Sequence, residues 1–180
     1  MHFDDLTPCD YDNGPLNPQQ WISPLLAVGW LDQHRPYPIG TTDRSVSDRL
    51  STLVQQAHVA FPHYLYRGEY DCALCISAGS TPPQQPWSQE CILVPGNGVI
   101  YASPGGIVHY MQAHGYCPPP AFALATLQCP DYTSPDFFDA LIRANRGGPL
   151  PIESAEDSAS RLRKSIEDII RAREIKRSFD

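Results

Sequence analysis

The pattern of apolar and polar positions predicts several short helices. Between residues 46 and 57, apolar residues recur at the spacing of one helical face, and Ser45 stands where the cap of such a helix belongs. Residues 119–129 and 134–148 show two further helical patterns, the second beginning at Ser134 and ending at a pair of glycines. The chain is therefore expected to be mainly helical.

Strand-like patterns are fewer. Residues 90–95 and 98–103 are apolar runs joined by a glycine-rich turn, which predicts a β-hairpin. Residues 63–72 are aromatic and roughly alternating, so they read as a strand that enters a turn at Gly68. The short apolar run at 25–31 fits a buried strand or a buried helix equally well. Together these patterns predict an α+β fold.

Changes in composition divide the chain. Residues 1–148 form the predicted domain, and residues 149–156 contain the prolines and small residues of a linker. Residues 157–180 are highly charged and predict a C-terminal helix with a narrow apolar stripe of Leu162, Ile166, Ile169 and Ile170.

Two pairs of residues have the spacing that is typical of metal ligands. Cys72 and Cys75 form a C-x2-C pair, and His109 and His114 follow with H-x4-H spacing. Two thiolates and two imidazoles make a tetrahedral shell for Zn²⁺. The order of cysteine pair, hairpin and ligand-bearing helix resembles a treble-clef-like zinc module embedded in the domain. Loss of a ligand is then expected to destabilise residues 68–118 as a whole.

The two histidines must meet at the end of a helix. On an ideal helix, residues five apart differ by about 140° of rotation. His109 and His114 can therefore reach one ion only if the helix ends or distorts near His114, and Gly115 stands where a helix stop belongs.

Other residues leave the ligand set open. Cys117 is the strongest substitute ligand, and His63 is a weaker one. A C-x2-C pair can also be redox-active, and any one of these residues alone is more often structural than a ligand. Cys9 is expected to be a free thiol without a role.

Composition and charge narrow the function. The chain has 180 residues, 19 prolines and a net charge of −7, and residues 1–150 hold 13 carboxylates against 6 arginines. Such an acidic body argues against nucleic-acid binding and suits a basic protein partner. No apolar run is long enough for a membrane span and no signal peptide is evident, so a cytoplasmic location with reduced cysteines is expected.

Motifs for catalysis are missing from the sequence. It contains no H-E-x-x-H, no G-x-S-x-G, no P-loop and no deaminase signature. Four good ligands also indicate a closed, structural zinc site rather than a catalytic one.

The first hypothesis is therefore a non-catalytic, acidic protein-binding module, such as an immunity or inhibitor protein that masks a partner. The alternative is a zinc-dependent hydrolase with an open metal position. A weaker alternative is a nucleic-acid adaptor that uses the basic residues 171–177. The residue types favoured at protein interfaces give these candidate contact residues: Tyr64, Tyr66, Arg67, Tyr70, Phe137 and Phe138.

Three segments together resemble a family of uncharacterised bacterial proteins. Residues 66–75 and 94–125 carry the patterns G-x-(H/Y)-x-C-x-x-C and H-Y-x-x-x-H-x-Y-x-P-P, and residues 27–40 precede them. The resemblance runs from about residue 25 to 145. Tyr70 departs from the histidine found in many relatives, which argues against a ligand at that position. The resemblance supports the zinc site and implies no activity.

Overall fold

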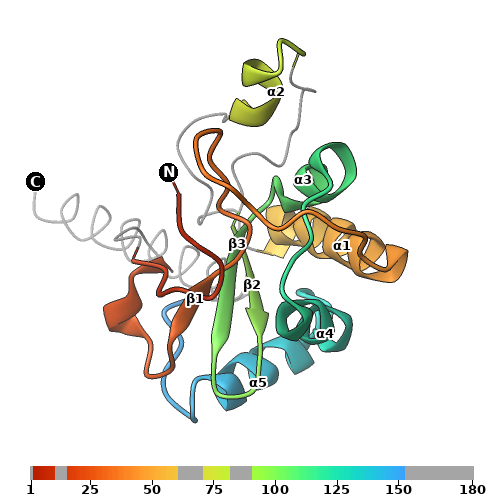
Figure 1. The fold of residues 1–180 in the computed structure, drawn as a ribbon. Helices are drawn as coiled ribbons and strands as arrows, with labels where there is room; N and C mark the ends of the chain where they lie inside the picture. The colour runs from red at the N-terminus through yellow and green to blue at the C-terminus, as the bar shows by residue number, and fades with distance from the viewer. Residues whose placement is uncertain (1, 11–15, 61–70, 82–90, 153–180) are drawn as a thin grey trace, which may run out of the picture.

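The computed structural model describes residues 2–10, 16–60, 71–81 and 91–152 (Figure 1). In chain order its elements are η2 (Pro18–Gln20), β1 (Leu25–Ala27), α1 (Arg44–Ala60), α2 (Ala73–Ser77), β2 (Cys91–Pro95), β3 (Ile100–Pro104), α3 (Ile107–His114), α4 (Pro120–Gln128) and α5 (Pro135–Ala144). Within the described residues, five α-helices and one three-stranded sheet form a single α+β domain, which confirms the predicted fold class.

The predicted hairpin supplies the central strand of the sheet, β3, and one edge strand, β2. Strand order is β1-β3-β2, so β3 pairs antiparallel with β2 and parallel with β1. The short apolar run at 25–31 thus contains a strand. Periodicity alone had not distinguished a strand from a helix there. Because β3 also pairs with β1, the hairpin is part of the main sheet of the domain. Along the chain it also lies between the cysteine pair and α3, in the order predicted from the sequence.

The N-terminal segment covers the outer edge of β1. The N–H groups of Leu6 and Cys9 donate to the carbonyls of Ala27 and Leu25 at 2.8 Å, and Ala27 N–H donates to Thr7 at 2.9 Å. Residues 6–9 therefore act as a further edge segment. This pairing satisfies backbone groups that an open strand edge would expose.

The core lies between the sheet and its helices. Helices α1, α4 and α5 all contact β2, and α3 packs against α1 (Figure 1). The Tyr101 ring meets the Phe122 ring edge-on at 5.7 Å, which joins β3 to α4. The largest completely buried aliphatic side chains include Leu16, Leu50, Leu53, Ile92, Ile100, Ile107 and Leu141.

One helix start differs from the prediction. Helix α1 begins at Arg44, and the cap is Asp43 rather than Ser45, because the Asp43 carboxylate accepts the N–H of Ser45 at 2.8 Å. Helix α3 begins at Ile107, since Pro104 still belongs to β3. The predicted cap of α5 is confirmed: the Ser134 hydroxyl accepts the N–H of Asp136 at 3.2 Å.

Several predictions fall on other parts of the chain. The strand at 63–72 lies almost wholly outside the described residues, as does the helix at 157–180, and the linker at 149–156 is described only to residue 152. Among the helices that the structure describes, none combines the length and the apolar character needed to cross a membrane.

Candidate metal centre

Helices α2 and α3 bring the four predicted ligands together. Cys72 is the N-cap of α2 and Cys75 lies in its first turn, whereas His109 and His114 lie on α3. One ligand atom from each of the four residues lies within 4.8 Å of the other three. The grouping of Cys72, Cys75, His109 and His114 predicted from spacing alone is therefore present.

The distances between ligand atoms fit a tetrahedral ion. Cys75 Sγ lies 3.3 Å from Nε2 of both histidines, and Cys72 Sγ lies 3.3 Å from His114 Nε2. The two Nε2 atoms are 3.2 Å apart. Around one Zn²⁺, bond lengths of about 2.3 Å to sulfur and about 2.0 Å to nitrogen imply edges of about 3.5 Å and 3.3 Å. The residues can thus hold such a metal with little rearrangement.

The start of α2 turns both sulfurs the same way. Cys72 has an extended backbone, and its Sγ accepts the N–H of Cys75 at 3.4 Å. A backbone N–H aimed at sulfur stabilises the thiolate, which is the form that binds metal. The C-x2-C spacing therefore brings both sulfurs to one side and gives the Cys72 sulfur a hydrogen bond that favours its thiolate form.

The end of α3 brings the second histidine to the first. His114 is the last residue of the helix, and Gly115 follows in the left-handed conformation with φ of 64°. The N–H groups of Gly115 and Tyr116 both donate to the carbonyl of Tyr110, the second at 3.1 Å, so the chain closes over the end of the helix. This geometry confirms the prediction that the helix stops at His114.

Burial sets the proton state of the ligands. Cys72, Cys75 and His109 are buried, and His114 is half-buried. Burial, followed by the nearby His114, lowers the pKa of His109, and burial lowers the pKa of His114. Both imidazoles therefore stay neutral and free to bind at neutral pH. Burial raises the pKa of Cys72, so a metal must displace its proton.

Tyr110 lies against the site, and the sequence analysis missed it. Its ring centroid is 5.9 Å from that of His109 and 6.4 Å from that of His114. Burial, and then the nearby thiolates of Cys72 and Cys75, raise the pKa of Tyr110 to about 12. Tyr110 thus remains a neutral phenol that shields one side of the ligand set. The feature of the sequence that could have indicated this role is the position of an aromatic residue directly after His109.

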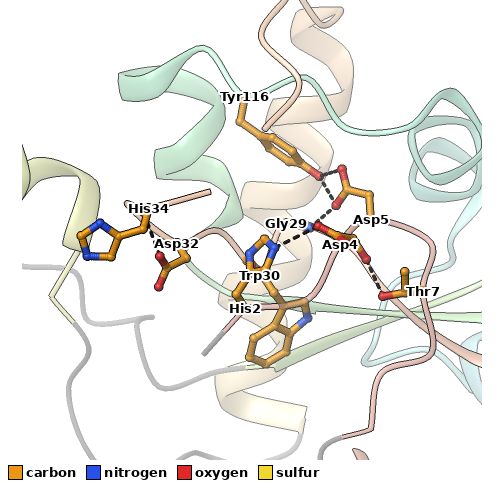
Figure 2. A network of polar contacts seen from close by, with 9 residues as sticks. All are labelled: His2, Asp4, Asp5, Thr7, Gly29, Trp30, Asp32, His34 and Tyr116. Carbon is orange, nitrogen blue, oxygen red and sulfur yellow. Dashed lines mark hydrogen bonds and ion pairs between the residues drawn. The ribbon is translucent and has the colours of Figure 1, made fainter. Parts of the chain in front are cut away.

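A second network holds the end of α3. Figure 2 shows the Tyr116 hydroxyl directed at the Asp5 carboxylate, to which it donates at 2.9 Å. The same carboxylate accepts the N–H of Gly29 at 2.9 Å. Burial, and then the charge of Asp5, raise the pKa of Tyr116. The N-terminal segment is thereby tied to the residue two positions after His114.

A loop pairs with the other side of the same turn. Gly40 N–H donates to the Gly115 carbonyl at 3.0 Å, and Cys117 N–H donates to the Pro38 carbonyl at 2.9 Å. His114 is therefore positioned by contacts on both sides of the turn that follows it.

Cys117 stays outside the ligand set. Its sulfur accepts a hydrogen bond from the Thr42 hydroxyl at 3.6 Å, and the grouping of four ligands does not include it. Cys9 is completely buried, and burial raises its pKa to about 12, so it is an inert thiol. His63 lies outside the described residues.

Of the six candidate contact residues, the structure describes only Phe137 and Phe138. Tyr64, Tyr66, Arg67 and Tyr70 lie outside the described residues. Phe137 is 0% exposed and packs on the Tyr132 ring at 4.3 Å, so it is a core residue rather than a surface anchor. Phe138 is half-buried against the core. The spacing of the two phenylalanines on α5 places them on different sides of the helix.

Comparison with known proteins gives a family and no named relative. No curated protein and no solved structure matches the chain. Residues 1–127 match the family described as a domain of unknown function, DUF7919, and this range includes all four ligands. The match covers more than half of the sequence, so the chain belongs to the DUF7919 family.

Proposed function

We propose that the four-residue centre binds one Zn²⁺ ion and that the ion is structural. The observation that carries this proposal is the set of ligand-atom distances of 3.2–3.3 Å, which match the edges of a tetrahedron. Two sulfurs and two nitrogens are the donor set that suits zinc among the common divalent ions. Four side-chain ligands fill a tetrahedral shell, which favours a structural ion over a hydrolytic one with a bound water.

Substitution with Co²⁺ tests the ligand set directly. Tetrahedral Co²⁺ with two thiolates gives intense visible absorption bands that octahedral Co²⁺ in water lacks. We expect these bands in the wild-type protein and their loss in Cys72→Ser. The matched control is Cys117→Ser, which removes a nearby thiol outside the group and should keep the spectrum. Equal loss in both variants would overturn the assignment.

We further propose that the domain is a non-catalytic module that binds another protein. The supporting feature is α4, which carries no charged residue and leaves Leu124 and Leu127 exposed at 58% and 46%. These positions are three apart and lie on one side of the helix. Exposed leucines on an uncharged helix are typical of a contact surface. The acidic body suits a basic partner, as for an inhibitor or immunity protein.

A reducing compartment such as the cytoplasm belongs to the same proposal. All six cysteines lie in the described residues, and none of them forms a disulfide. Zinc ligands must be thiolates, which persist where disulfides are kept reduced.

Paired surface variants test the contact surface. Tagged wild-type protein captures partners from a lysate, and the captured partners are purified. Calorimetry then measures the affinity of a purified partner for the wild type and for Leu124→Asp. The matched control is Ile142→Asp, on α5, where Ile142 is also exposed. We expect at least a tenfold weaker affinity for the α4 variant only, and weaker binding of the wild type at high salt. Equal affinities for the two variants would contradict the proposed surface.

A further inference from the structure

The element that carries both cysteines stands apart from the rest of the domain. Figure 1 shows α2 beyond the ends of the sheet, away from the helices that cover it. In the segment 71–81 only Cys72 and Cys75 are buried, and Ile76 is 56% exposed although it is apolar. Neither cysteine belongs to the main hydrophobic core. The segment therefore lacks the apolar burial that normally holds a helix in place.

Hydrogen bonds also do little to hold residues 71–81 against the rest of the domain. Within the described residues, every hydrogen-bond-range contact from segment 71–81 to another part of the chain joins a cysteine sulfur to a histidine nitrogen. Its remaining bonds are internal, such as Ala78 N–H to Leu74 and Ser80 N–H to Cys75, at 3.1 and 3.0 Å. Within the described part of the chain, the ligand atoms are thus the polar attachment of this segment to the domain.

The histidine side of the centre is anchored independently. Ile107 and Val108 on α3 belong to the main core, so the helix has apolar packing that does not involve the metal ligands. The end of α3 is fixed in addition by the bond between Tyr116 and Asp5. Among the residues that the structure describes, neither the core packing of α3 nor the bond between Tyr116 and Asp5 involves Cys72 or Cys75.

We propose that the metal centre is a latch: the ion holds residues 71–81 against α3, and its loss releases this segment while the sheet and its helices stay folded. This inference rests on the proposed zinc site. It differs from the expectation that loss of a ligand destabilises all of residues 68–118. It also gives the site a regulatory consequence, because removal of zinc would free the buried Cys72 and Cys75 thiols.

Hydrogen exchange with mass spectrometry tests the latch on the full chain. Zinc-loaded protein and protein treated with a zinc chelator are compared in a reducing buffer, and native mass spectrometry of the same samples counts the bound ions. We expect amides of residues 74–80 to exchange at least tenfold faster after chelation. Peptides from β2 and β3 should keep their protection, as should peptides from α1.

Two variants extend the test. Cys72→Ser should give fast exchange in 74–80 even with added zinc, whereas Cys117→Ser should behave as wild type. Should Cys72→Ser fail to fold, chelation of the wild type still decides the question.

Each outcome has a separate meaning. A bound ion with unchanged exchange at 74–80 after its removal would overturn the latch alone. Loss of protection across β2, β3 and α1 after chelation would also overturn it, because the ion would then support the whole domain. A folded protein that binds no zinc would overturn both the latch and the proposed metal centre.

Discussion

The Nε2 atoms of His109 and His114 lie 3.2 Å apart, although the two residues are five positions apart on α3. An ideal helix would direct them about 140° apart. They meet because His114 is the final helical residue and Gly115 turns the chain away with a positive φ. The metal centre therefore depends on how α3 ends as much as on the ligands themselves.

Replacement of Gly115 should weaken metal binding. Its φ of 64° is a conformation that alanine adopts only with strain, so Gly115→Ala should destabilise the protein by about 1 kcal/mol. The displaced helix end should also lower zinc affinity, measured by competition with a chromophoric chelator. Gly115→Asn is the matched control, because asparagine tolerates this conformation better. An affinity that is unchanged in Gly115→Ala would refute this dependence.

Loss of the Tyr116 hydroxyl should destabilise the fold. Tyr116→Phe leaves the half-buried Asp5 carboxylate with one donor fewer, and a hydrogen bond to a charged group contributes about 1.5–3 kcal/mol. Urea unfolding of zinc-loaded protein measures the change. Tyr37→Phe is the control, because that hydroxyl makes no hydrogen bond within the described residues. Similar midpoints for the two variants would mean that the bond to Asp5 contributes little.

The ligands were predictable because their information is local. The C-x2-C and H-x4-H spacings, with Gly115 after the second histidine, identify the donors and the place where α3 ends. The hairpin and the starts of α4 and α5 also follow from short patterns. Each of these features depends on residues that are near neighbours in the chain.

Features that join distant residues were not predictable. Asp5 and Tyr116 are 111 positions apart, and nothing near either residue indicates the other. Strand β1 has three residues, too few for periodicity to distinguish a strand from a helix. Phe137 resembled an interface anchor because aromatic residues serve both in cores and at interfaces, and only the packing on Tyr132 separates the two.

Acidification should release the metal. Protons compete with the ion for the thiols, and burial already raises the pKa of Cys72, so zinc binding must release protons. Because two thiols each lose one proton, the apparent affinity should rise with pH near neutrality by up to about a hundredfold per pH unit. Calorimetry in buffers of different ionisation enthalpy counts the protons. Binding that is independent of pH would exclude thiolate ligands.

Asn145 should be essential to the stability of the domain. It is completely buried, its side-chain oxygen accepts the N–H groups of Ile22 and Ser23 at 2.8 and 3.0 Å, and its amide donates to Pro149 at 2.9 Å. Asn145→Ala leaves these groups unpaired and should cost about 2–4 kcal/mol in the free energy of unfolding.

The control is Asn97→Ala, because Asn97 is exposed at a turn. Thermal denaturation compares the melting temperatures of the two variants. A melting temperature for Asn145→Ala as high as that of the Asn97 variant would show that the three hydrogen bonds are dispensable.

The most direct test of the metal centre is its stoichiometry. Protein purified without added metal or chelator is analysed for its elements by plasma mass spectrometry and for its intact mass under native conditions. The arrangement of Cys72, Cys75, His109 and His114 predicts one zinc ion per chain, and a variant that lacks Cys72 and Cys75 should carry none. A fully folded wild-type protein that contains no metal and takes up no added zinc would contradict the account.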